Sequence, residues 1–164
     1  MHRFVFFNLI CLLGTLFHPT FANTAEDDIT IDIIQTLSFG TLIPGPGHTG
    51  SVTLHPDQPV TFQGGLRALG KQPHIMIAQL SGKPFCRFDA RLQMLNNPPA
   101  PADLSALTLS EESAFDRFGQ AELRAGGTLR LHGPISTGNL SAVIMLEVIY
   151  QADHLQPKGC VLSP

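Results

Sequence analysis

Apolar and polar residues alternate over short stretches of this chain, and the first such stretch is residues 29–45. Every second residue from Ile29 to Ile33 is isoleucine, the period of two expected of a half-buried β-strand. The alternation slips at Ile34 and resumes at Leu37, so a β-bulge is expected near residues 35–36. A cluster of glycine and proline then closes the stretch as a turn. The pattern predicts one strand in two halves.

Seven further segments have the same character and are separated by turn residues. Residues 96–103 hold three prolines and are expected to be irregular, because proline removes a backbone donor and fixes φ. A second turn is expected over residues 56–59, and residues 111–119 are expected to form a polar loop or one helical turn. The predicted strands are residues 51–55, 60–62, 74–80, 86–92, 104–109, 123–131 and 141–150.

The sequence predicts an all-β protein. Glycine and proline together make 28 of the 164 residues, and no stretch has the period of an amphipathic helix. Many short strands bounded by turn signals are typical of a sandwich or a barrel. We therefore expect a single domain built as a sandwich or a barrel of short strands.

The last predicted strand, residues 141–150, is apolar on both faces. Its even positions form one apolar face, and its odd positions include Val143, Met145 and Ile149. An outer strand of a sandwich usually has polar residues on its solvent side. A partner, or the chain's own C-terminal tail, is therefore expected to cover the second face.

The chain begins with a segment that has the three parts of a secretory signal peptide. Arg3 is followed by an apolar run over residues 4–17 and by a small-x-small sequence that ends at Ala22. The run is shorter than the roughly 20 residues of a membrane span, although an uncleaved anchor is the alternative. The predicted organisation is a signal peptide over residues 1–22, a sandwich domain over 23–150 and an irregular tail over 151–164. We expect export to the periplasm or cell surface of a bacterium.

Charge and cysteine content narrow the function classes further. The chain carries a net charge of −3, which becomes −4 without the signal peptide, whereas a nucleic-acid binder needs a basic face. No cluster of lysine or arginine indicates an anionic membrane surface. Cys86 and Cys160 are the two cysteines beyond the signal peptide, and an even pair in an oxidising compartment predicts a disulfide bond. Two unpaired buried thiols are the alternative.

The sequence contains no recognisable catalytic or metal-binding motif. The histidines outside the signal peptide lack the spacing of a metal site, so surface positions are expected for them. Glu111, Glu112 and Asp116 form an acidic cluster in a predicted loop, where adjacent carboxylates point apart and do not form a glycosidase pair. We therefore predict no enzyme activity, no cofactor and no metal. The histidines concerned are His48, His55, His74, His132 and His154.

Several segments carry a family resemblance. They read LSFGTLIPGPGHTGSVTL, IAQLSGKPF, GGTLRL and TGNLSAVIMLEVIY. With them the chain, from about residue 31 to residue 150, resembles the bacterial exported family catalogued as domain of unknown function 4402. The resemblance implies a secreted immunoglobulin-like sandwich similar in style to pilus and spore-coat subunits, and it implies no activity. Cys86 stands where the family tends to have an aromatic residue, which implies a disulfide particular to a subgroup.

Two functional hypotheses follow. The first is a pilin-like structural or adhesive subunit of the cell envelope that assembles by β-strand addition, with itself, other envelope subunits or a periplasmic chaperone as partners. In this hypothesis the N-terminal segment of one subunit fills a groove beside the last strand of another. The second is a monomeric secreted module that binds a carbohydrate or a small apolar ligand. The candidate partner surface consists of Ile29, Ile31, Ile33, Val143, Met145 and Ile149.

Overall fold

The computed structural model of the chain describes residues 29–45, 47–133, 139–158 and 160. The predicted signal peptide, residues 1–22, lies outside the described residues, as do residues 23–28 of the predicted domain and 161–164 of the predicted tail. The described chain is all-β, and all its strand pairs are antiparallel. Its elements are β1 (Thr30–Gln35), β2 (Leu42–Ile43), β3 (Thr49–His55), β4 (Gln58–Gln63), β5 (Arg67–Ala68), β6 (Met76–Ser81), β7 (Phe88–Asn96), β8 (Ala102–Leu109), β9 (Gln120–His132), β10 (Val143–Tyr150) and the 3-10 turn η1 (Asp153–Leu155).

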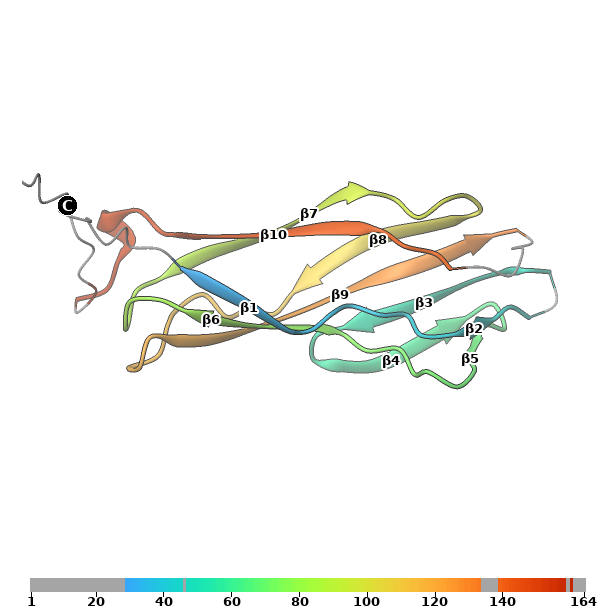
Figure 1. The fold of residues 1–164 in the computed structure, drawn as a ribbon, viewed down its shortest axis with the longest axis horizontal. Helices are drawn as coiled ribbons and strands as arrows, with labels where there is room; N and C mark the ends of the chain where they lie inside the picture. Colours follow the sequence, from blue (N-terminus) through green and yellow to red (C-terminus); the bar gives the residue numbers. More distant parts are fainter. Residues whose placement is uncertain (1–28, 46, 134–138, 159, 161–164) are drawn as a thin grey trace, which may run out of the picture.

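The strands form one large sheet and a two-stranded sheet that lies along it (Figure 1). The large sheet has the order β1-β6-β9-β3-β4, and β8 pairs with the other edge of β9. In the second sheet β10 pairs with β7 over its whole length, from Val143 opposite Asn96 to Tyr150 opposite Phe88. The short strands β2 and β5 form a separate pair. The described part of the chain is therefore an elongated structure of two layers.

β9 is the centre of the large sheet. Its first half pairs with β6 and its second half pairs with β3, and the change of partner falls at Gly126 and Gly127. A side chain at Gly126 would collide with the backbone carbonyl of Leu54. Glycine is needed here because the backbone of β3 approaches β9 too closely for a Cβ atom. The glycine pair thus lets one long strand hold both β6 and β3.

The core between the two layers is built from inward-facing residues of both sheets. Leu80 and Leu123 of the large sheet are fully buried together with Cys86 and Phe88, at the start of the second sheet. Leu146 and Val148 of β10 pack against the same cluster. A second buried cluster lies under β3, β8 and β9, at the opposite end of the large sheet, and its members are Val52, Leu66, Ala102, Leu129 and Leu131.

The structure confirms the slip predicted near residues 35–36, because the register of β1 against β6 shifts between Ile33 and Gln35. The turn predicted over residues 56–59 is too long, since β4 already begins at Gln58 and contains Pro59. Proline is tolerated there because β4 is an edge strand whose outer side needs no donor.

The strand partner of the opening stretch is β6 of the same domain, which pairs with β1.

Cys86 and Cys160 form the predicted disulfide bond, with a Cα–Cα distance of 4.7 Å. The bond attaches the C-terminal tail to the start of β7. The Gln156 side chain strengthens this attachment, because its amide accepts from the Arg87 N–H at 2.6 Å and donates to the Arg87 carbonyl at 2.9 Å. Within its described residues the tail contains η1 and no strand. The predicted disulfide bond therefore fixes the C-terminal tail to the domain.

Candidate functional site

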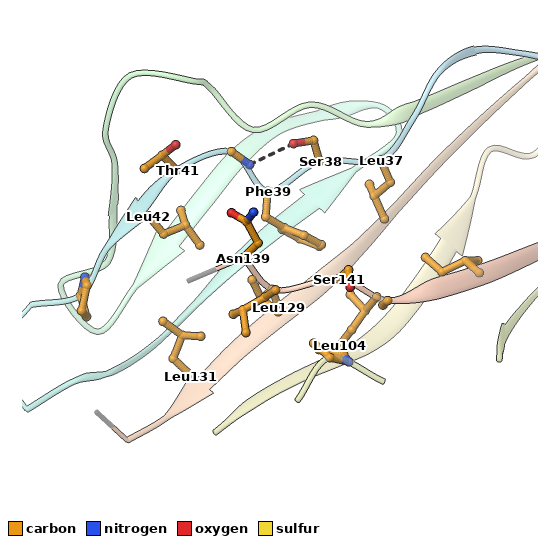
Figure 2. Close-up of a pocket in the computed structure, with 16 residues that line it drawn as sticks. Leu37, Ser38, Phe39, Thr41, Leu42, Leu104, Leu129, Leu131, Asn139 and Ser141 are labelled. Carbon is orange, nitrogen blue, oxygen red and sulfur yellow. Dashed lines mark hydrogen bonds between the residues drawn. The ribbon is translucent and has the colours of Figure 1, made fainter. Parts of the chain in front are cut away.

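A groove with a volume of about 650 Å³ opens between the segment after β1 and the start of β10 (Figure 2). Its walls come from these two segments, and its floor comes from β8 and β9 of the large sheet. No lining residue carries a charged side chain. The lining residues are Leu37, Ser38, Phe39, Gly40, Thr41, Leu42, Pro44, Pro98, Leu104, Leu129, Leu131, Asn139, Leu140, Ser141, Ala142 and Ile144.

The first wall is shaped by the Phe-Gly pair of the opening stretch. Gly40 has a φ of +69°, and a Cβ atom there would collide with the backbone carbonyl of Lys71. The glycine therefore lets the chain turn close against residues 71–73, and Phe39 packs against the second core cluster. In Figure 2 the Phe39 side chain lies between this wall and the floor. The Phe-Gly pair thus places an aromatic ring in the groove.

The floor of the groove is formed by Leu104 of β8 and by Leu129 and Leu131 of β9. Leu104 pairs directly with Leu129, and Leu129 and Leu131 are two positions apart on one strand. Residues with this spacing lie on the same face of a sheet. Their side chains are only 3–6% exposed, because Phe39, Leu42 and Leu140 close over the second core cluster. The floor is therefore continuous with the core.

The second wall consists of the start of β10 and the residues just before it, including Ile144 of β10 and Ala142. In the described part of the chain, β10 pairs with β7 alone, so its other edge has no strand beside it. An unpaired edge presents a row of backbone N–H and C=O groups that can accept another strand. The groove thus combines an apolar floor with an open strand edge.

The candidate partner residues of the sequence lie elsewhere, in two separate places. Ile31 and Ile33 are 36% and 42% exposed on β1, at one edge of the large sheet, and Ile29 packs against the first core cluster. On β10, Ile149 and the other odd positions face away from the core. Their exposures are 52% for Val143, 39% for Met145 and 47% for Ile149. The structure does not bring the two sets together, because they belong to different sheets.

The C-terminal tail does not cover the outer face of β10 within its described residues, since that face keeps these exposures. The groove itself is lined by Ile144 of β10 and by Ala142 just before it, two of the even positions that the sequence identified only as one apolar face. The first wall is formed by the LSFGTLIPG segment, which the sequence analysis identified as part of the family resemblance and not as part of a groove.

A second hollow contains part of the acidic cluster of the sequence, together with Arg124, which pairs with two other carboxylates. The Arg124 guanidinium is 2.8 Å from the Glu122 carboxylate and 3.8 Å from that of Asp57. Glu111 and Glu112 also line this hollow. Among the residues that the structure describes, no group of three histidine, cysteine or acidic side chains is arranged to hold a metal ion. No described helix is long and apolar enough to cross a membrane.

Comparison with known proteins adds no relative: no protein-family model, no curated protein and no solved structure matches this chain. The resemblance to the exported family therefore stays a prediction from the residues.

Proposed function

We propose that this chain is an exported structural or adhesive subunit of the bacterial cell envelope that assembles by β-strand addition. The observation that carries the proposal is the apolar groove beside the open edge of β10. Strand addition uses exactly such a pair of features, because the open edge supplies main-chain hydrogen bonds and the pockets accept alternate side chains. The signal-like N-terminus and the disulfide bond support export to an oxidising compartment.

The position of the groove also supports an immunoglobulin-like reading of the fold. A constant-type immunoglobulin domain has strands A, B, E and D in one sheet and C, F and G in the other. The succession β1-β6-β9-β8 follows the pattern A-B-E-D, and β7 paired with β10 follows C-F. The hairpin of β3 and β4 is an addition to that pattern. A strand G would lie at the open edge of β10, where the groove is found.

The test is a substitution that fills the groove without touching the core. Ala142→Arg places a long charged side chain on the groove wall, whereas Thr61→Arg places the same side chain on the exposed edge strand β4. The mature chain is expressed in a bacterial periplasm, and its assemblies are separated by size with and without mild heating. We expect the original chain and Thr61→Arg to form heat-labile assemblies with other envelope proteins, and Ala142→Arg to lose them. A folded Ala142→Arg protein that still assembles contradicts the proposal.

A second candidate function is a monomeric module that binds a small apolar ligand or a carbohydrate. The groove volume lies within the range of about 300–1,000 Å³ typical of small-molecule sites, and its lining is uncharged. This candidate predicts a sharp monomer in the same size separation. It also predicts a bound small molecule in native mass spectra that Ala142→Arg removes. Those two results together would replace the first function by the second.

A further inference from the structure

Building on the proposed function, we infer the chemistry of the occupant of the groove. It is a single extended segment of a second polypeptide, supplied by another protein. The segment pairs through its main chain with β10 and inserts uncharged apolar side chains at every second position. Four observations carry this inference: the direction of the free backbone groups of β10, the orientation of the opposite wall, the spacing of the floor residues and the engagement of β1.

The free backbone groups of β10 belong to its even residues. The N–H of Gln151 donates to the carbonyl of Arg87 at 3.0 Å, one step beyond the pair of Tyr150 and Phe88. In an antiparallel pair, hydrogen-bonded and non-bonded residues alternate along the strand. The odd residues therefore bond to β7, and even residues such as Ile144 and Leu146 direct their N–H and C=O groups to the open edge. The same residues face the core with their side chains.

The opposite wall is already paired on the side away from the groove. The N–H of Thr41 donates to the carbonyl of Lys71 at 3.1 Å, and the carbonyl of Thr41 accepts from Leu69 at 2.7 Å. Ser38 exchanges both of its backbone hydrogen bonds with His74. The amide of Gly40 is held by the Ser38 hydroxyl at 3.2 Å, as Figure 2 shows. The first wall is therefore already hydrogen-bonded on its far side, and the β10 wall supplies the open strand edge.

The floor sets the spacing and polarity of the incoming side chains. Leu129 and Leu131 are two positions apart on β9, a separation of about 6.6 Å along a strand. A segment that runs along β10 repeats its inward side chains at the same interval, because the sheets of a sandwich are aligned to within about 30°. Since no lining residue is charged, a charged side chain would be buried without a partner, which is strongly unfavourable.

β1 of a second copy is not the expected donor of this segment, because β1 is already paired with β6 of its own domain. It pairs with β6 from Thr30 opposite Ser81 to Gln35 opposite Ile77. The side-chain amide of Gln35 also donates to the carbonyl of Ile75 at 2.7 Å. Moving β1 into the groove of another copy would break these bonds and leave the edge of β6 unpaired. A segment from a different protein completes the second sheet without that loss.

The inference is tested with the purified mature protein and a synthetic peptide of about nine residues, the length of a long strand. The peptide has valine and threonine in alternation and a lysine at each end. We expect it to raise the melting temperature in proportion to the logarithm of its concentration, as linked binding requires. Replacing its two central valines by aspartate should weaken binding at least tenfold.

N-methylation distinguishes main-chain pairing from simple apolar contact. One peptide carries the methyl groups on its valine amides and another on its threonine amides, so that each blocks one edge of the strand. We expect at least one of them to bind ten times more weakly than the parent peptide. We also expect Ala142→Arg to abolish binding and Thr61→Arg to leave it unchanged. Equal affinity of all three peptides overturns the inference.

Failure of the inference and failure of the proposed function give different results. If the peptide does not bind but the protein alone forms heat-labile assemblies that deletion of residues 23–34 abolishes, the donor is β1 of a second copy. The envelope function then stands and the inference falls. If neither peptide binding nor assembly occurs, and an apolar dye binds in a manner that Ala142→Arg blocks, both proposals fall in favour of a small ligand.

Discussion

The hydroxyl of Tyr150 accepts a hydrogen bond of 2.7 Å from the backbone N–H of Lys83. This bond joins the last residue of β10 to the turn that follows β6, so it links the two sheets at one end of the molecule. The ring of Tyr150 also lies 5.9 Å from the ring of Phe115, which belongs to the loop between β8 and β9. The end of β10 is therefore held by contacts that do not depend on β7.

We predict that Tyr150→Phe lowers the free energy of unfolding by about 1 kcal/mol, the typical net value of one hydrogen bond. The phenylalanine ring keeps the contact with Phe115, so only the hydrogen bond is lost. Tyr150→Ala removes the ring as well and should cost about 3 kcal/mol or more. Urea unfolding of the three proteins measures both differences. Equal losses for the two variants would contradict the separate role of the hydroxyl.

The disulfide bond should contribute a large part of the stability. It closes a loop between residues 74 positions apart, for which the chain-entropy model gives about 4 kcal/mol. Replacing both Cys86 and Cys160 by alanine should therefore lower the free energy of unfolding by about that amount. Chemical denaturation of the oxidised protein and of the double variant checks this. An unchanged midpoint in the double variant would show that the tail stabilises the domain without the covalent bond.

Alanine substitutions at two glycines can distinguish the cost of backbone strain from the cost of a steric collision. Gly40 and Gly70 have similar φ values of +69° and +74°, but only Gly40 has a backbone atom in the space of a Cβ. Gly70→Ala should therefore cost about 1 kcal/mol, the value for a left-handed residue other than glycine. Gly40→Ala should cost clearly more, because the chain must also move away from Lys71. Thermal unfolding compares the two variants, and equal costs would contradict the close approach at Gly40.

The outer face of β10 can be tested independently of the groove. Met145→Thr and Ile149→Thr replace exposed apolar side chains, so each should change the free energy of unfolding by no more than about 0.5 kcal/mol. If this face contacts a partner, the double variant should form smaller assemblies than the original chain in light scattering. If the assemblies of the double variant are unchanged, the outer face of β10 is not a contact surface, and association uses the groove or β1.

Local sequence patterns predicted most of the strands, and the reason is visible in β1 and β9. The second half of the opening stretch was predicted wrongly, because it forms only the two-residue strand β2, which pairs with β5 outside the large sheet. The alternation of apolar and polar residues breaks at Ile34, and the register of β1 against β6 shifts at the same place. The predicted strand over residues 123–131 lies within β9 despite its glycine pair, because apolar residues alternate on both sides of the pair. Irregular structure at the prolines between β7 and β8 follows from the missing donors.

The groove could not be predicted in the same way. Phe39, Leu104, Leu129 and Ile144 meet in it, although they come from four segments spread over more than half of the chain. Alternation shows which side of a strand is apolar, but not which strands become neighbours. The odd positions of β10 attracted attention because they are apolar where a polar face is expected. Ala142 and Ile144, the even positions that line the groove, looked like part of an ordinary core face.

The Cys86–Cys160 bond also determines how the domain bears mechanical tension. β7, β8, β9 and β10 all lie between the two cysteines, inside one covalent loop. A force applied through the chain beyond Cys160 passes through the sulfur atoms to Cys86, so the loop cannot be pulled out. At about 3.4 Å per residue, the extended length of the loop, roughly 250 Å, is therefore not released when the chain is pulled. Of the chain up to Cys160, only the segment before Cys86 can lengthen under load, and no tension passes along β10, which lies inside the loop.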